Sequence, residues 1–161
     1  MRYALHFPGA LLISAAALWA QDYKGPVPPK ADVPYLLHAS TLVEVDAREA
    51  HQETKKDETT FWIEGTASPT RTPLAEPIFI MRADKLRPEK IELYRFTIKK
   101  DRRELTIRDK PKRDDPAAPL HLSVTKVGKD IYRIEASEVL ANGEYSLSPS
   151  GSNEVFSFQV Y

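Results

Sequence analysis

The stretch LANGEYSLSPSGSNEVFSFQVY, residues 140–161, decides the fold class of this chain. Apolar side chains alternate with polar ones at Tyr145 and Leu147, and again at Phe156 and Phe158. Side chains at every second position lie on the same face of a strand. The Pro, Gly and Asn residues between the two runs are typical of a turn. The stretch therefore predicts two antiparallel strands, each with one apolar face.

The same alternation of strand and turn signals continues upstream, where short runs rich in β-branched and aromatic residues are broken by Pro, Gly, Asn and Asp. We expect strands at residues 35–45, 59–65, 78–82, 91–99, 104–108, 120–127, 131–136, 144–148 and 154–160. Residues 47–54 and 83–90 are the two candidate helices. The first segment lacks an apolar stripe and could equally be the tip of a polar hairpin, and Pro88 interrupts the second. Many strands and almost no helix predict an all-β antiparallel domain, a sandwich or a barrel.

The first residues are typical of a signal peptide. Arg2 precedes an apolar run from Ala10 to Trp19, which ends in small residues. We expect cleavage after Ala20, with Ala17 as the alternative. The run is too short to cross a membrane, so a retained anchor is the weaker interpretation, and no transmembrane helix is expected after cleavage.

The mature chain is expected to begin with a tether and continue as one domain. Residues 21–34 are rich in proline, which favours an extended segment. Residues 35–161 have the size of a single domain with its own core. The chain contains no cysteine, so the domain is held without disulfides.

Residues 140–147 resemble the tyrosine corner of immunoglobulin-like Greek-key β-sandwiches. In that corner, a Tyr near the start of the penultimate strand bonds back to upstream backbone. Tyr145 matches this position, and Asn142 and Gly143 supply the turn. The resemblance implies an immunoglobulin-like sandwich of about seven to nine strands. It departs from antibody domains at Leu147, which stands where they carry a cysteine. The alternative is an ordinary hairpin whose Tyr only packs in the core.

Residues that could carry chemistry are scattered. His38, His51 and His121 each stand alone, and no nucleophile motif or Gly-rich phosphate loop accompanies them. Glu49, His51 and Glu53 would share one face of a strand and could hold a metal, but interleaved basic residues are more typical of a solvated face. We therefore assign no catalytic residue, no cofactor and no metal site. Carboxylates paired in space for glycoside hydrolysis would not show in the sequence.

A basic hairpin is the candidate binding surface. Its four residues are Lys99, Lys100, Arg102 and Arg103. We expect a turn at 101–103, with Ile98 across from Leu105 and Ile107, so that the cations project from the other face. An anionic envelope polysaccharide or an acidic protein surface is the expected partner. Aromatic residues do not interleave with the charges, which argues against nucleic acid. The alternative is that these charges only keep an exposed edge soluble.

Bulk charge points to no partner, because 23 Lys and Arg residues balance 23 Asp and Glu residues. The Pro-rich loop 66–77 is either a recognition loop or a crossover between sheets. These features predict an exported, non-catalytic module with a binding or structural role in a bacterial cell envelope, periplasmic or extracellular. A small secreted or periplasmic hydrolase, for example one acting on sugars, is one alternative. An inhibitor or chaperone-like partner of another exported protein is the other.

Overall fold

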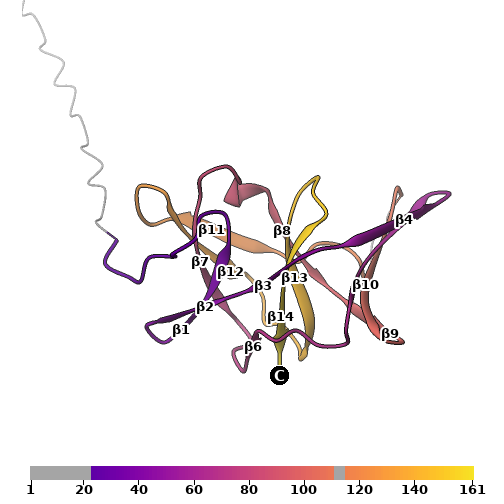
Figure 1. Ribbon diagram of the computed structural model, residues 1–161, viewed down its shortest axis with the longest axis horizontal. Coiled ribbons are helices and arrows are strands. Elements are labelled where there is room, and N and C mark those ends of the chain that lie inside the picture. The colour runs from indigo at the N-terminus through magenta and orange to yellow at the C-terminus, as the bar shows by residue number, and fades with distance from the viewer. Residues whose placement is uncertain (1–22, 111–114) are drawn as a thin grey trace, which may run out of the picture.

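The computed structural model describes residues 23–110 and 115–161. Over these residues the chain folds into fourteen strands and one short 3-10 helix, Pro88–Lys90 (Figure 1). The prediction of an all-β antiparallel domain is confirmed, although the strands outnumber the seven to nine expected. The described part of the chain contains no helix with the length and hydropathy needed to span a membrane. The predicted signal peptide lies outside the described residues.

The strands form three sheets, in which every ladder except one is antiparallel. Sheet A has the order β11 (Leu122–Lys126), β12 (Ile131–Ala136), β7 (Ile78–Arg82), β1 (Pro34–His38) and β2 (Thr41–Glu44). Sheet B has the order β3 (Asp46–Glu49), β14 (Glu154–Val160), β13 (Gly143–Pro149) and β8 (Ile91–Arg95), and β6 (Arg71–Thr72) runs parallel to the end of β14. Sheet C has the order β4 (His51–Lys55), β5 (Glu58–Glu64), β10 (Arg102–Arg108) and β9 (Thr97–Lys99).

Sheet B is the middle layer, with sheet A on one side and sheet C on the other (Figure 1). Side chains of β13 and β14 alternate between the two sides. Tyr145, Leu147 and Phe158 belong to the apolar core shared with sheet A. Val155 belongs to a smaller cluster shared with sheet C. Both faces of sheet B are therefore buried, which a two-layer sandwich does not require.

Sheets B and C share continuous chain at both of their edges. Residues 46–55 run from β3 in sheet B into β4 in sheet C, broken only at Ala50. Residues 91–99 run from β8 into β9, broken only at Phe96, whose N–H donates to the Glu144 carbonyl at 2.8 Å. The two sheets thus enclose the space between them from both sides.

Several predicted elements need correction. The strand predicted at 35–45 is the hairpin β1–β2, which turns at Ala39 with a φ of 56°. Residues 47–54 are not helical but belong to β3 and β4. The Pro-rich loop 66–77 is a crossover from sheet C to sheet A, and its short strand β6 extends the edge of sheet B. By contrast, β7, β12 and β14 have the predicted bounds.

The described part of the predicted tether packs on the domain. Pro28 is buried, and Arg82 Nη2 donates to the Pro29 carbonyl at 2.9 Å. Asp32, with a φ of 61°, accepts the backbone N–H groups of the turn after β7 at 2.8–3.1 Å; the donors are Asp84, Lys85 and Leu86. Partial burial alone would raise the pKa of the Asp32 carboxyl, but these three N–H groups hold it below its ordinary value. Asp32 therefore clamps the N-terminal segment to sheet A.

The tyrosine-corner contact is present. Tyr145 is 1% exposed, and its hydroxyl donates to the Ala141 carbonyl at 2.6 Å. Arg95 lies over its ring with 5.9 Å between the guanidinium carbon and the ring centroid. The predicted burial of Tyr145 and its bond to upstream backbone are both confirmed, and they hold the turn before β13 against the core.

Candidate functional site: a cavity between sheets B and C

The faces of sheets B and C that meet differ in chemistry. On sheet B, Ser146 and Ser148 alternate with the core residues of β13, and their partners across the ladder to β8 are Tyr94 and Glu92. On sheet C, Leu105 lies across from Phe61 on the same face. One wall of the space therefore carries hydroxyl and carboxyl groups, and the other is mainly apolar, with Gln52 beside Phe61.

A buried polar network joins the sheets at one end of this space. Arg103 of β10 is 1% exposed and lies 3.3 Å from the Glu144 carboxylate of β13, which is 2% exposed. The same guanidinium donates to Ser157 Oγ at 3.1 Å and to the Gly65 carbonyl at 3.0 Å. The Ser68 N–H donates to Glu144 at 2.9 Å from the crossover loop. The network thus ties β10, β13, β14 and that loop together.

Burial opposes both charges of this pair. It lowers the pKa of Arg103 and raises the pKa of Glu144, while each charge partly offsets the effect on the other. Glu144 Oε1 has no hydrogen-bond partner among the described residues. Because guanidinium groups stay protonated in proteins, the network acts as a fixed ionic tie rather than as a proton-transfer site.

A cavity of about 260 Å³ lies further along the same strands. Its apolar lining includes Phe61, Tyr94, Phe96, Leu105, Ile107 and Val155. Its polar lining includes Gln52, Glu92, Ser146, Ser148 and Asn153. The β13–β14 turn, residues 149–153, forms the rim on the sheet B side. The cavity therefore lies between two sheets and one turn. Its sheet C side is apolar apart from Gln52, and its sheet B side combines Tyr94 and Val155 with hydroxyl and carboxyl groups.

The polar groups of the cavity are already oriented. The Tyr94 hydroxyl donates to Glu92 Oε2 at 2.9 Å. Burial, this hydrogen bond and the nearby Glu92 charge raise the pKa of Tyr94, so its hydroxyl keeps its proton at neutral pH. Ser146 and Ser148 share a hydrogen bond through their hydroxyls. Glu92 is the only charged side chain among the described residues that line the cavity.

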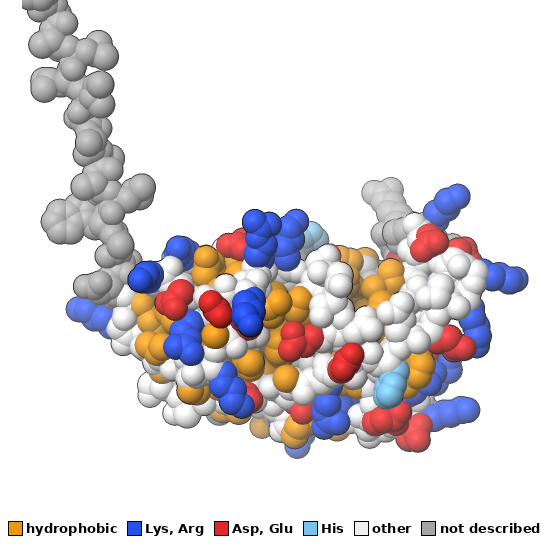
Figure 2. Space-filling model, turned by 45° about the horizontal axis from the view of Figure 1, so that its top comes forward, with side chains coloured by type: hydrophobic (Ala, Val, Ile, Leu, Met, Phe, Trp, Pro, Cys, Tyr) orange, Lys and Arg blue, Asp and Glu red, His pale blue; other side chains and the backbone are white. Residues whose placement is uncertain are grey.

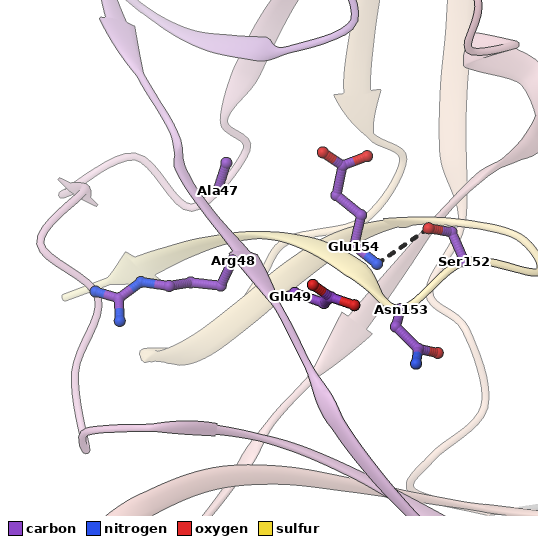
Figure 3. A pocket seen from close by; sticks show the side chains of 6 residues that line it. All are labelled: Ala47, Arg48, Glu49, Ser152, Asn153 and Glu154. Carbon is purple, nitrogen blue, oxygen red and sulfur yellow. Dashed lines mark hydrogen bonds between the residues drawn. The ribbon is translucent and has the colours of Figure 1, made fainter.

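A second hollow lies outside, along the β3 edge of sheet B (Figure 3). It has a volume of about 440 Å³, and its lining includes Glu49 and Glu154, which are cross-strand partners. The Glu154 N–H donates to Ser152 Oγ at 3.0 Å, and burial raises the pKa of the Glu154 carboxyl. This hollow is larger but open, and no aromatic side chain lines it. The cavity between sheets B and C is less open and is therefore the better candidate site.

The predicted basic residues do not form one exposed patch. Lys99 and Arg102 both pair with Glu104, at 3.0 and 2.8 Å, and Lys100 is exposed at the turn. Arg103, by contrast, is buried in the network described above.

The four basic side chains do not project together because the predicted register of the two hairpin strands is wrong. The turn is at Lys100 and Asp101, and Ile98 pairs with Arg103 rather than with Leu105. Figure 2 shows basic and acidic side chains interspersed over the face in view. The hairpin therefore remains a prediction from the sequence that this geometry does not favour.

The sequence-derived metal candidate is divided between two strands. Glu49 ends its strand in sheet B, whereas His51 and Glu53 lie in β4 of sheet C. The His51 ring stacks on Trp62 with 5.3 Å between ring centroids. Within residues 23–110 and 115–161, no three His, Cys, Asp or Glu side chains are grouped to hold a metal ion. His38 and His121 are both exposed.

Sequence reasoning missed the residues of the cavity. Glu92 with Tyr94, and Ser146 with Ser148, are polar pairs at alternate positions, which alone indicate a solvent-facing side of a strand. Comparison of the chain with protein-family models, with curated proteins and with solved structures finds no match. The geometry of the cavity is therefore the basis for a function.

Proposed function

We propose that this chain is a non-catalytic binding module that holds a small organic molecule between sheets B and C. The cavity is the observation that carries the proposal. Its volume of about 260 Å³ lies just below the range of about 300 to 1,000 Å³ that is usual for ligand pockets, which limits the ligand to a small molecule. Such pockets are mostly apolar with a few polar groups that orient the ligand, as here. A ligand with an apolar body and a polar end fits this lining.

The side chains of the cavity favour binding over hydrolysis. General acid–base catalysis needs titratable groups within hydrogen-bond reach of the reacting atoms. Glu92 is the only charged group among the described lining residues, and its oxygen already accepts from Tyr94, whose hydroxyl keeps its proton. A sugar hydrolase would use a second carboxyl group on the opposite side of the ligand, where Phe61 and Leu105 lie.

The location and the finer fold class are part of the same proposal. An apolar run near Arg2 and the absence of cysteine support an exported module of a bacterial envelope, periplasmic or extracellular. The Tyr145 contact supports an immunoglobulin-like relationship for the layers formed by sheets A and B, with sheet C as an addition. Measuring whether the protein is retained on an envelope fraction would test the location independently of the ligand.

Filling the cavity with a larger side chain provides the direct test of binding. Ser148→Phe would place a ring in the cavity from a half-buried position, whereas Ser123→Phe places the same ring on an exposed position of β11 in sheet A. A library of small organic molecules is titrated into the isotope-labelled protein and followed by amide chemical shifts. We expect some members to shift the amides of β8 and β13 in the parent and in Ser123→Phe, but not in Ser148→Phe. A library that shifts none of these amides in the parent would contradict the proposal.

A further inference from the structure

Three aromatic side chains from different parts of the chain line the cavity. Phe61 comes from β5, Tyr94 from β8, and Phe96 from the residue that joins β8 to β9. The three close ring pairs found among the described residues all lie elsewhere in the molecule. The rings of the cavity are therefore not stacked on one another. The face of an aromatic ring carries partial negative charge, which attracts cations.

Other aromatic rings of this protein already contact a basic side chain. Arg71 lies over Tyr161, Arg95 over Tyr145, Arg102 over Trp62 and Lys126 over Tyr132, at 4.4–5.9 Å from the ring centroids. No such contact to the three rings of the cavity is found within the described residues. Tyr94 and Phe96 are buried in the smaller apolar cluster, so a cation from outside the chain would meet the parts of these rings that line the cavity.

Glu92 adds a negative charge to this aromatic lining. Its carboxylate accepts a hydrogen bond from the Tyr94 hydroxyl, and no ion pair of Glu92 is found within residues 23–110 and 115–161. Resting on the proposed function, we infer that the ligand is a small organic cation whose charge is surrounded by methyl or methylene groups, such as a quaternary ammonium compound. Aromatic rings beside a carboxylate are suited to that chemistry.

The lining also argues against other cations. A divalent metal ion needs several oxygen ligands, and the wall formed by Phe61, Leu105 and Ile107 adds only the side-chain amide of the neighbouring Gln52. A bare ammonium group is strongly hydrated and needs several acceptors to replace its water. The hydroxyls of Ser146 and Ser148 already bond to each other. An alkylated ammonium needs few acceptors and gains from apolar and aromatic contact, so it fits best.

Two probes of nearly equal shape test the inference. The first is 2-hydroxyethyl-trimethylammonium, and the second is its uncharged carbon analogue, 3,3-dimethylbutan-1-ol. Each is titrated into the full protein by calorimetry and by amide chemical shifts. We expect the cation to bind about tenfold more tightly than the alcohol, which corresponds to a cation–π and carboxylate contribution of about 1.4 kcal/mol.

Matched variants show which side chains cause the preference for the cation over the alcohol. Glu92→Gln should reduce the affinity for the cation about tenfold and leave that for the alcohol unchanged. Tyr94→Phe keeps the ring and should change the affinity for the cation less than about threefold, which also keeps the test valid if Glu92→Gln folds poorly. Glu138→Gln removes a carboxylate that faces His121 and does not line the cavity, and this variant should bind both probes as the parent does.

The outcomes separate the inference from the proposed function. Equal binding of the two probes, unchanged in Glu92→Gln, would overturn the cationic ligand while leaving a small-molecule site. Failure of both probes to bind, while uncharged library members shift the amides of β8 and β13, would overturn it as well. Failure of every probe and library member would overturn the proposed function together with the inference. A preference for the cation that disappears in Glu92→Gln would support it.

Discussion

The two faces of sheet B meet their neighbouring layers in different ways. Toward sheet A, side chains such as Phe156, Phe158 and Leu147 are fully buried in a continuous apolar core. Toward sheet C, the same two strands present serines, Glu144 and Val155 to a smaller apolar cluster, a buried ion pair and a cavity. A single sheet thus serves a stabilising interface on one side and a ligand-sized space on the other.

The difference lies in how each interface is held together. The A–B interface relies on apolar burial, which has no directional requirement. At the B–C interface, two segments of chain run from one sheet into the other, and the Arg103–Glu144 ion pair joins the sheets as well. Both features constrain the spacing of the sheets. Fixed spacing allows part of that interface to remain open as a cavity. We expect substitutions on the two sides to differ in cost in the order given below.

The largest loss of stability is expected for a substitution in the A–B core. Phe158→Ala removes a side chain that is 0% exposed and should lower the free energy of unfolding by about 4 kcal/mol. Phe61→Ala, on the cavity side, starts from a half-buried ring and should cost only about 2 kcal/mol. Urea unfolding of both variants measures the difference. Equal losses would mean that the B–C interface is packed as tightly as the A–B core.

The ion pair should be the next most sensitive position. Arg103→Met leaves the buried Glu144 carboxylate without its cation and should cost about 3 kcal/mol. The double variant Arg103→Met, Glu144→Leu removes both charges and should recover most of this loss. Chemical denaturation of the parent and the three variants gives the coupling energy. If the two single losses simply add in the double variant, the tie between the sheets is not ionic.

The sequence predicts the layers of this fold unequally, for physical reasons. The strands β7, β12 and β14 are predicted with correct bounds because apolar residues and turn residues mark them clearly. The segment that becomes β3 and β4 is rich in exposed charged residues and helix formers, so its strand character does not show.

The candidate site was hidden for a related reason. Arg103 shares a face with Leu105, which is a usable signal for burial, but a basic residue near a turn is normally exposed. The serines of β13 resemble a solvated face because one strand cannot reveal that a third sheet covers it. The cavity therefore follows from tertiary structure rather than from any local pattern.

A moderate effect is expected at the Asp32 clamp beside the end of β7. Asp32→Asn tolerates the φ of 61° but loses the charge, and should cost about 1 kcal/mol near neutral pH. The folded pKa of Asp32 is lowered, so its stabilisation is present above the unfolded pKa and is lost as the pH falls through the folded pKa.

Unfolding measured from pH 7 down to acid should therefore show the parent and Asp32→Asn converging at low pH. A difference in stability that stays constant over this range would contradict the lowered pKa. Glu135→Gln in β12, measured in parallel, controls for the general loss of a carboxylate from sheet A.

A loss of stability similar to that of Asp32→Asn is expected at the tyrosine corner. Tyr145→Phe keeps the ring in the A–B core but removes the hydrogen bond to the Ala141 carbonyl, and should cost about 1 kcal/mol. Thermal unfolding against the parent measures it, with Tyr132→Phe in sheet A as the control. A Tyr145→Phe variant that melts with the parent would show that the corner only packs.

The Asp32 clamp also sets the path of mechanical force through the molecule. A pull on the segment at Tyr23 reaches Asp32 and is passed through its backbone contacts to the end of β7. That strand is an inner strand of sheet A, flanked by β12 and β1. The load therefore enters sheet A, which lies across sheet B from the cavity. A domain held by its N-terminal segment can be pulled upon while the walls of its cavity keep their spacing.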